Sequence, residues 1–146
     1  MELYNPFYVD EYEVTALRAN HAASTSPVIY LIKKDNKSVL YCHDTNLFQE
    51  ETIDYLKQIN YKINLISLDC TLAANDIRFS NGGHMSIFGC DEFINQLKSI
   101  GLVDEDTKII LSHFSHIGKN VLYDDFVSIA ANFGFEVSYD GMEIEI

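Results

Sequence analysis

The sequence has no tryptophan, only two prolines and only three cysteines among its 146 residues. The cysteines Cys42, Cys70 and Cys90 are odd in number, lie far apart and form no CxxC pair. This pattern argues against a disulfide framework and against a cysteine zinc site. We therefore interpret each cysteine as a small core residue of a protein in a reduced compartment, and we expect a cytoplasmic location.

Basic residues are also scarce, because 10 Lys and Arg stand against 22 Asp and Glu and give a formal net charge of −12. Such a surface repels phosphate backbones, so general nucleic-acid binding and attachment to an anionic membrane are disfavoured. No stretch approaches the ~18–20 apolar residues of a membrane helix, and Glu2 stands where a signal peptide carries basic residues. The hydrophobic fraction of 47% nevertheless predicts one folded domain over residues 1–146.

Hydrophobic periodicity divides the chain into strands that alternate with helices. Asn46 and Gln49 have the spacing of a capping box at the start of a helix, and Gly101 and Gly134 are expected to end the two later helices. Strands alternating with helices predict an α/β architecture. The predicted strands cover residues 12–19, 28–33, 38–42, 63–68, 108–111, 136–139 and 142–146, and the predicted helices cover 46–59, a segment around 90–97, and 123–133.

Histidines and aspartates recur at the ends of these predicted strands. In an α/β sheet such ends meet at one edge, where ligands bind. Taken singly, each side chain has an ordinary explanation: Asp44 as a helix cap, Asp69 as an acceptor for backbone N–H groups, or a histidine in a hydrogen-bonded core. Their shared placement favours a functional site instead. The residues are His21, His43, Asp44, Asp69, His113 and His116, together with His84 after a double glycine.

Six stretches, in their order and intervals, resemble the second half of the metallo-β-lactamase superfamily. The resemblance is to the branch that holds phosphoribosyl cyclic phosphodiesterase-like hydrolases and tRNase Z. It implies half of a four-layer αββα sandwich, with a mixed, mostly antiparallel sheet and about three helices. The stretches are LRANH at 17–21, LYCHDT at 40–45, LISLDCT at 65–71, GHMS at 83–86, ILSHFSH at 110–116 and YDGME at 139–143.

The resemblance also implies roles for individual residues. His21 would be a ligand of a first metal ion, Asp44 a carboxylate bridging two ions, and His113 a ligand of the second. Imidazole and carboxylate suit Zn²⁺ or Mn²⁺, and two such ions about 3.5–4 Å apart polarise a phosphoryl oxygen together. His84 would lie against the substrate phosphate as a catalytic residue, and His116 would be a second catalytic residue on the substrate side.

The HxHxDH motif of the superfamily is absent from the sequence. The resemblance therefore covers most of this chain but only about half of a complete family member. His21, Asp44 and His113 give each ion one private ligand and a shared carboxylate, whereas catalytic zinc sites keep three protein ligands. We expect partial or no metal occupancy in this chain alone, and an apolar sheet face that something else must cover.

Three interpretations follow. The chain is a fragment of a metal-dependent hydrolase that cleaves a small phosphodiester or cyclic phosphate. Alternatively, it is a half that pairs with a copy of itself or with a separate N-terminal half. In the third interpretation it is a non-catalytic acidic binding domain descended from that family. The chain alone is expected to be weakly active or inactive.

Overall fold

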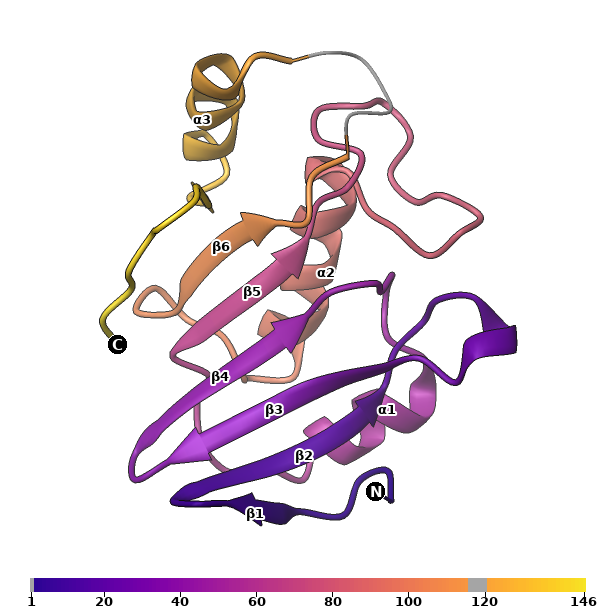
Figure 1. Cartoon of the computed structure of the whole chain (residues 1–146), viewed down its shortest axis with the longest axis vertical. Helices are drawn as coiled ribbons and strands as arrows, with labels where there is room; N and C mark the ends of the chain where they lie inside the picture. Colours follow the sequence, from indigo (N-terminus) through magenta and orange to yellow (C-terminus); the bar gives the residue numbers. More distant parts are fainter. Residues whose placement is uncertain (1, 116–120) are drawn as a thin grey trace.

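A mixed sheet of seven strands forms the centre of the computed structural model, which describes residues 2–115 and 121–146 (Figure 1). Each strand pairs with the one before it in the chain. The strands are β1 (Phe7–Val9), β2 (Tyr12–Arg18), β3 (Val28–Lys34), β4 (Lys37–Cys42), β5 (Leu65–Asp69), β6 (Lys108–Ser112) and β7 (Glu136–Val137). The helices are a 3₁₀ turn at Ala23–Thr25, α1 (Glu50–Leu56), α2 (Ile87–Ser99) and α3 (Tyr123–Ala131).

The direction of the strands brings four of their ends to one edge. Strands β1 to β4 are antiparallel neighbours, whereas β4, β5, β6 and β7 are parallel. Because β3 runs against both of its neighbours, β2 has the same direction as β4, β5 and β6. The carboxyl ends of these four strands therefore lie at the same edge of the sheet, as the sequence predicted.

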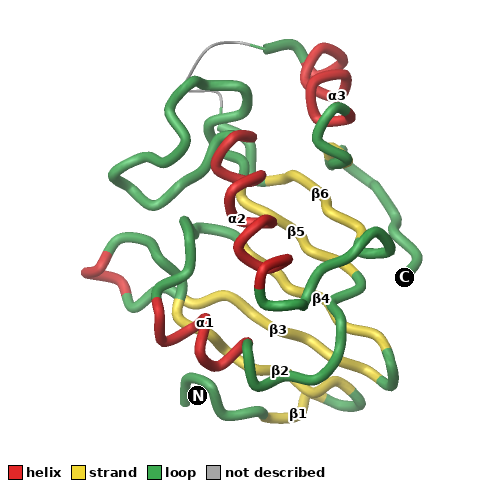
Figure 2. Tube along the Cα trace, turned by 180° about the vertical axis from the view of Figure 1, so that it is seen from behind, coloured by secondary structure: helices red, strands yellow, loops and turns green. Residues whose placement is uncertain are grey.

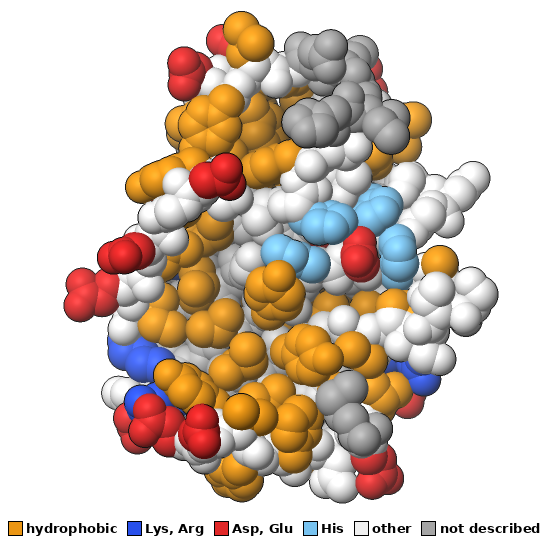
Figure 3. All heavy atoms as spheres, in the orientation of Figure 1, with side chains coloured by type: hydrophobic (Ala, Val, Ile, Leu, Met, Phe, Trp, Pro, Cys, Tyr) orange, Lys and Arg blue, Asp and Glu red, His pale blue; other side chains and the backbone are white. Residues whose placement is uncertain are grey.

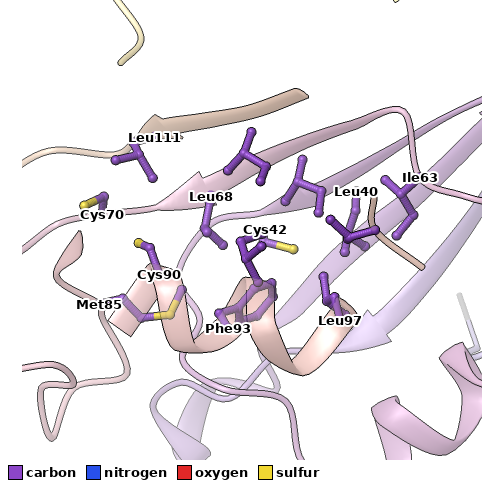
Figure 4. Packing of buried hydrophobic residues seen from close by; sticks show 14 of the residues in the cluster. Leu40, Cys42, Ile63, Leu68, Cys70, Met85, Cys90, Phe93, Leu97 and Leu111 are labelled. Carbon is purple, nitrogen blue, oxygen red and sulfur yellow. The ribbon is translucent and has the colours of Figure 1, made fainter. Parts of the chain in front are cut away.

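Helices α1 and α2 cover one face of the sheet. Figure 1 views the sheet from the opposite face, and Figure 2, turned by 180°, views it with the two helices in front. Phe93 and Leu97 of α2 are fully buried and pack with Leu40 and Leu68 of the strands (Figure 4). Cys90 lies one helical turn before Phe93 and is buried as well. The 3.6-residue period of α2 therefore presents a continuous apolar stripe to the sheet.

The opposite face carries no helix within the described residues, and apolar side chains spread across it (Figure 3). Side chains alternate along each strand, so the neighbours of the buried core residues point to this side. Tyr30 pairs with Tyr41, Ile32 pairs with Val39, and Val39 pairs with Leu65 across three adjacent strands. The Tyr41 side chain is 42% exposed, and the others are half-buried. We call these five residues the open sheet face.

Most predicted elements are confirmed to within a few residues, and Gly101 and Gly134 follow α2 and α3 with positive φ. The capping box is wrong, because α1 starts at Glu50 without a side-chain cap and the Asn46 side chain accepts a hydrogen bond from the neighbouring Leu47 N–H. The predicted strand at 142–146 is also wrong. Those residues alternate in burial, but they join no ladder of the sheet.

The three-residue strand β1 was not predicted, because Phe7–Val9 is too short for a period to be read from the sequence. In the part of the chain that the structure describes, none of the helices is long and apolar enough to cross a membrane.

Candidate metal centre

Two carboxylates and two imidazoles meet at the carboxyl edge of the sheet. One potential ligand atom from each of Asp44, Asp69, His84 and His113 lies within 4.8 Å of the others. Asp44 follows β4, Asp69 ends β5, His113 follows β6, and His84 precedes α2. Figure 3 shows histidine side chains gathered around an acidic side chain on this face of the molecule. We call these four residues the metal cluster.

Asp69 is the buried anion of the metal cluster, with no exposed surface. Its Oδ1 accepts hydrogen bonds from the N–H of Thr71 at 3.0 Å and from the Thr71 hydroxyl at 2.8 Å. Its Oδ2 lies 2.8 Å from Nδ1 of His84 and 3.5 Å from Nδ1 of His113. A buried carboxylate needs such partners, because burial without them is costly. Asp69 therefore orients the imidazole rings of both His84 and His113 from its buried position at the end of β5.

Asp44 and His113 both have left-handed backbone conformations, with φ of +49° and +61°. Non-glycine residues adopt this region uncommonly, and such residues gather at functional sites. The Asp44 side chain is 53% exposed, and its Oδ1 lies 3.4 Å from Nε2 of His113. The turn that follows each strand thus directs two potential ligands towards each other.

His21 lies beside the metal cluster rather than in it. Its ring centroid is 4.8 Å from that of His84, and its Nδ1 lies 3.4 Å from the carbonyl oxygen of Gly83. Gly83 has a φ of +87°, and a Cβ at this position would lie 2.6 Å from the His21 Cα. The absence of a side chain at Gly83 therefore allows the loop before His84 to approach His21.

A cleft of about 560 Å³ opens next to the metal cluster. His21, Asp44 and His113, the three residues predicted as metal ligands, all line it. Its remaining lining residues are Thr25, Pro27, Val28, Tyr30, Tyr41 and His43. The cleft therefore joins the predicted ligands to the aromatic end of the open sheet face.

His43 is held against the sheet by two hydroxyl groups. Its Nε2 lies 2.7 Å from Oγ of Ser112 and 3.0 Å from Oγ of Ser67. Its ring lies 4.1 Å from that of Tyr41 and 5.5 Å from that of His113, between ring centroids. Burial lowers the pKa of His43 below its usual value, and the charge of the neighbouring His113 lowers it further. His43 therefore tends to be neutral beside the metal cluster.

The metal cluster has the donor chemistry of a site for a divalent cation. It combines carboxylate oxygens with imidazole nitrogens, which are ligands of Zn²⁺ and Mn²⁺. The structure brings together Asp44 and His113 and adds Asp69 and His84 to them. The roles of His21, Asp44 and His113 as ligands and of His84 as a catalytic residue remain predictions. His116, the other predicted catalytic residue, lies outside the described residues.

Sequence reasoning gave Asp69 no specific role and missed Thr71. Asp69 was placed among the strand-end residues of a functional site, but it was not named as a metal ligand or a catalytic residue. Thr71 offered no comparable signal, because a threonine two residues after a strand is common. The interpretation of Cys42, Cys70 and Cys90 as core residues is confirmed, since all three are buried. Burial raises the pKa of the Cys42 and Cys90 thiols well above the usual value.

Comparison with known proteins finds likeness in structure alone. No family model matches the sequence, and no curated protein does. The metallo-β-lactamase fold protein YhfI from Bacillus subtilis matches over 94% of this chain and 49% of its own, with a TM-score of 0.65 and 16% identity. Unliganded yeast PDE1 matches over 97% of this chain and 48% of its own, with a TM-score of 0.68 and 11% identity.

Zn²⁺-bound PqqB from Methylobacterium extorquens matches over 100% of this chain and 55% of its own, with a TM-score of 0.71 and 14% identity. The chain thus spans about half the length of each of these solved structures. At such low sequence identity the likeness concerns the fold. Nearly the whole chain has the metallo-β-lactamase fold, and it corresponds to about half of the complete fold.

Proposed function

We propose that the chain is part of a metal-dependent hydrolase of the metallo-β-lactamase superfamily that cleaves phosphodiesters. One observation carries the proposal: the potential ligand atoms of Asp44, Asp69, His84 and His113 lie within 4.8 Å of one another where parallel strands end. The order of the sequence motifs supports the substrate class. The adjoining cleft of about 560 Å³ is large enough for a small phosphodiester or a cyclic phosphate.

In this proposal the residues of the chain divide the work between binding and proton transfer. Asp44 and His113, with His21 from the same cleft, would hold a divalent cation. Such a cation, when bound, supplies positive charge that polarises a phosphoryl oxygen. His84 donates its Nδ1–H to Asp69 at 2.8 Å, which fixes the orientation of the ring. With Nδ1–H bound to Asp69, the imidazolium form of this ring would protonate a leaving oxygen from Nε2 and return to the neutral Nδ1–H form.

Calorimetric titration with Zn²⁺ and with Mn²⁺ tests the binding residues. We expect the wild-type chain to bind metal weakly, in line with partial occupancy, and we expect Asp44→Asn and His113→Ala to weaken binding at least about tenfold further. Asp54→Asn is the matched control, because Asp54 is an exposed carboxylate on α1 that pairs with Lys57. Failure of the wild-type chain to bind at millimolar metal would refute the site.

Turnover of bis(p-nitrophenyl) phosphate tests the catalytic role of His84. We expect His84→Ala to lower kcat about 100-fold or more, because general acid catalysis contributes about 10²–10⁴-fold. Equal turnover by the variant contradicts the assigned role. The second candidate is a non-catalytic binding domain, because His21, Asp44 and His113 give each ion fewer than the three protein ligands of a catalytic zinc site. This candidate is supported if the chain binds metal but shows no turnover even when an N-terminal half of the fold is present.

We further propose that a second β-sheet covers the open sheet face in the active protein. The supporting observations are the apolar side chains Tyr30, Ile32, Val39, Tyr41 and Leu65 on one face, and the match to only about half of the solved structures. A net charge of −12 on each molecule opposes self-association. We therefore assign the second sheet to an N-terminal half of the fold, in the same longer protein or in a separate chain, rather than to another copy of this chain.

Sedimentation velocity and binding of the hydrophobic dye ANS test this proposal. We expect a monomer that binds the dye, and we expect the variant Val39→Lys to bind less of it. The control is Thr107→Val. The buried Thr107 hydroxyl donates a hydrogen bond to the carbonyl oxygen of Ile63, and Thr107 is not one of the five residues of the open sheet face. A stable dimer would assign the open sheet face to a second copy. A monomer that binds no dye would show that nothing needs to cover the face.

A further inference from the structure

Thr71 lies at the centre of the metal cluster although its side chain is not a potential ligand of the kind found there. Its hydroxyl oxygen lies 2.8 Å from Oδ1 of Asp69, 2.9 Å from Nδ1 of His113 and 3.2 Å from Nδ1 of His84. The same oxygen is 2.9 Å from the carbonyl oxygen of His113. A single hydroxyl thus contacts one carboxylate, one carbonyl and two imidazoles.

The hydrogen count decides how these contacts are satisfied. A threonine hydroxyl has one proton to donate and two lone pairs to accept with. The Asp69 carboxylate and the His113 carbonyl only accept, so the hydroxyl proton goes to one of them. The lone pairs then face the imidazoles, which are the only neighbours able to donate. A proton on Nδ1 of His113 satisfies these contacts best, because without it three acceptors would compete for the single hydroxyl proton.

Protonation of Nδ1 leaves Nε2 of a neutral His113 with a free lone pair. That nitrogen lies 3.4 Å from Oδ1 of Asp44, the other residue of the metal cluster that would hold the proposed cation. Metal-binding histidines commonly donate their other ring N–H to a neighbouring acceptor, which fixes the tautomer and the ring orientation. The hydroxyl of Thr71 fits this arrangement, and Asp69 at 2.8 Å keeps its proton turned away from the ring.

We propose that Thr71 is a positioning residue that holds His113 in the Nδ1–H tautomer, so that Nε2 is free to bind a divalent cation. The binding of a cation by Nε2 rests on the proposed function, whereas the tautomer of His113 does not. Without the hydroxyl, a ring proton of His113 has a carboxylate on either side: Asp44 Oδ1 lies 3.4 Å from Nε2, and Asp69 Oδ2 lies 3.5 Å from Nδ1. Removal of the hydroxyl therefore takes away the closest partner of Nδ1–H, at 2.9 Å, and shifts the tautomer balance towards the nitrogen that the metal would need.

The experiment separates tautomer from metal binding. Long-range ¹H–¹⁵N spectra of the metal-free protein, at a pH where the histidines are neutral, report which nitrogen of His113 is protonated. We expect Nδ1–H in the wild type and in Thr71→Ser, and a shift towards Nε2–H in Thr71→Val. The control is Thr107→Val, which removes a buried hydroxyl that bonds the carbonyl of Ile63 away from the site. We expect it to leave His113 unchanged.

Calorimetry with Mn²⁺ and Zn²⁺ supplies the second measurement. We expect Thr71→Val to weaken binding about 10–100-fold, the usual effect of losing a partner of a metal ligand, and Thr71→Ser to remain within about threefold of wild type. An unchanged tautomer in a folded Thr71→Val protein would overturn the proposal. If the wild type binds no metal, the proposed function fails, while the tautomer measurement still decides the role of Thr71. If Thr71→Val does not fold, the His113 tautomer is measured in Thr71→Ser, which keeps the hydroxyl. Loss of the Nδ1–H tautomer in Thr71→Ser would overturn the proposal.

Discussion

Substitution of Gly83 by alanine tests how closely the loop before His84 must approach His21. A Cβ at Gly83 would lie 2.6 Å from Cα of His21, 2.7 Å from its Nδ1 and 2.8 Å from the carbonyl oxygen of Asn20. The backbone φ of +87° adds a cost of about 1–2 kcal/mol for any L side chain. Overpacking of this kind adds about 1–3 kcal/mol. We therefore expect Gly83→Ala to lower the free energy of unfolding by about 2–5 kcal/mol.

Gly82 offers a matched control one residue away. A Cβ there would meet Oγ of Ser80 at 3.7 Å and Cδ2 of His84 at 3.8 Å, which are ordinary contacts. Urea denaturation of both variants measures the difference, and thermal unfolding of Gly83→Ala should shift by about 5–15 °C. Gly82→Ala should remain within about 0.5 kcal/mol of wild type. Equal stability of the two variants would refute the close approach of this loop to His21.

Two further predictions concern the core. Phe93→Ala removes a fully buried ring under the sheet and should lower the free energy of unfolding, measured in urea, by about 3–5 kcal/mol. The control Phe114→Ala, at a residue that is 39% exposed, should lower it much less. Similar losses in the two variants would place Phe93 outside the core. Because burial raises the thiol pKa of Cys42 and Cys90, the folded protein keeps protons that the unfolded chain loses. Stability should be complete below about pH 8.5 and fall at higher pH, by up to about 1.4 kcal/mol per pH unit for each thiol. Urea denaturation at several pH values measures this slope, and an equal slope in the double variant Cys42→Ala, Cys90→Ala contradicts the assignment.

The sequence predicted those parts of the fold in which one periodicity persists over several residues. The stripe of Cys90, Phe93 and Leu97 located α2 because each residue is buried one turn after the last. Residues 142–146 have an equally clear alternation, yet they form no strand, because alternation reports burial of one side and not a pairing partner. Local patterns thus identify faces, whereas sheet pairing depends on segments far apart in the chain.

The candidate site was predictable for a similar reason and only in part. Asp44 and His113 stood at strand ends, and parallel strands bring such ends together. Thr71 reaches the same place through a hydroxyl whose four contacts come from residues 2, 13 and 42 positions away. No local pattern announces contacts of that range, and the positive φ of Asp44 and His113 is equally invisible in the sequence.

The order of the strands in the sheet has a consequence for how the protein is made. Because every strand from β1 to β7 pairs with the strand that precedes it, a chain emerging from the ribosome can extend the sheet one edge at a time without waiting for a later strand to insert. The predicted metal ligands follow the same schedule, from His21 after β2 to His113 after β6. If they bind a cation as proposed, a nascent chain completes most of the described sheet before the last of them is made, and its shape forms ahead of its capacity to capture metal.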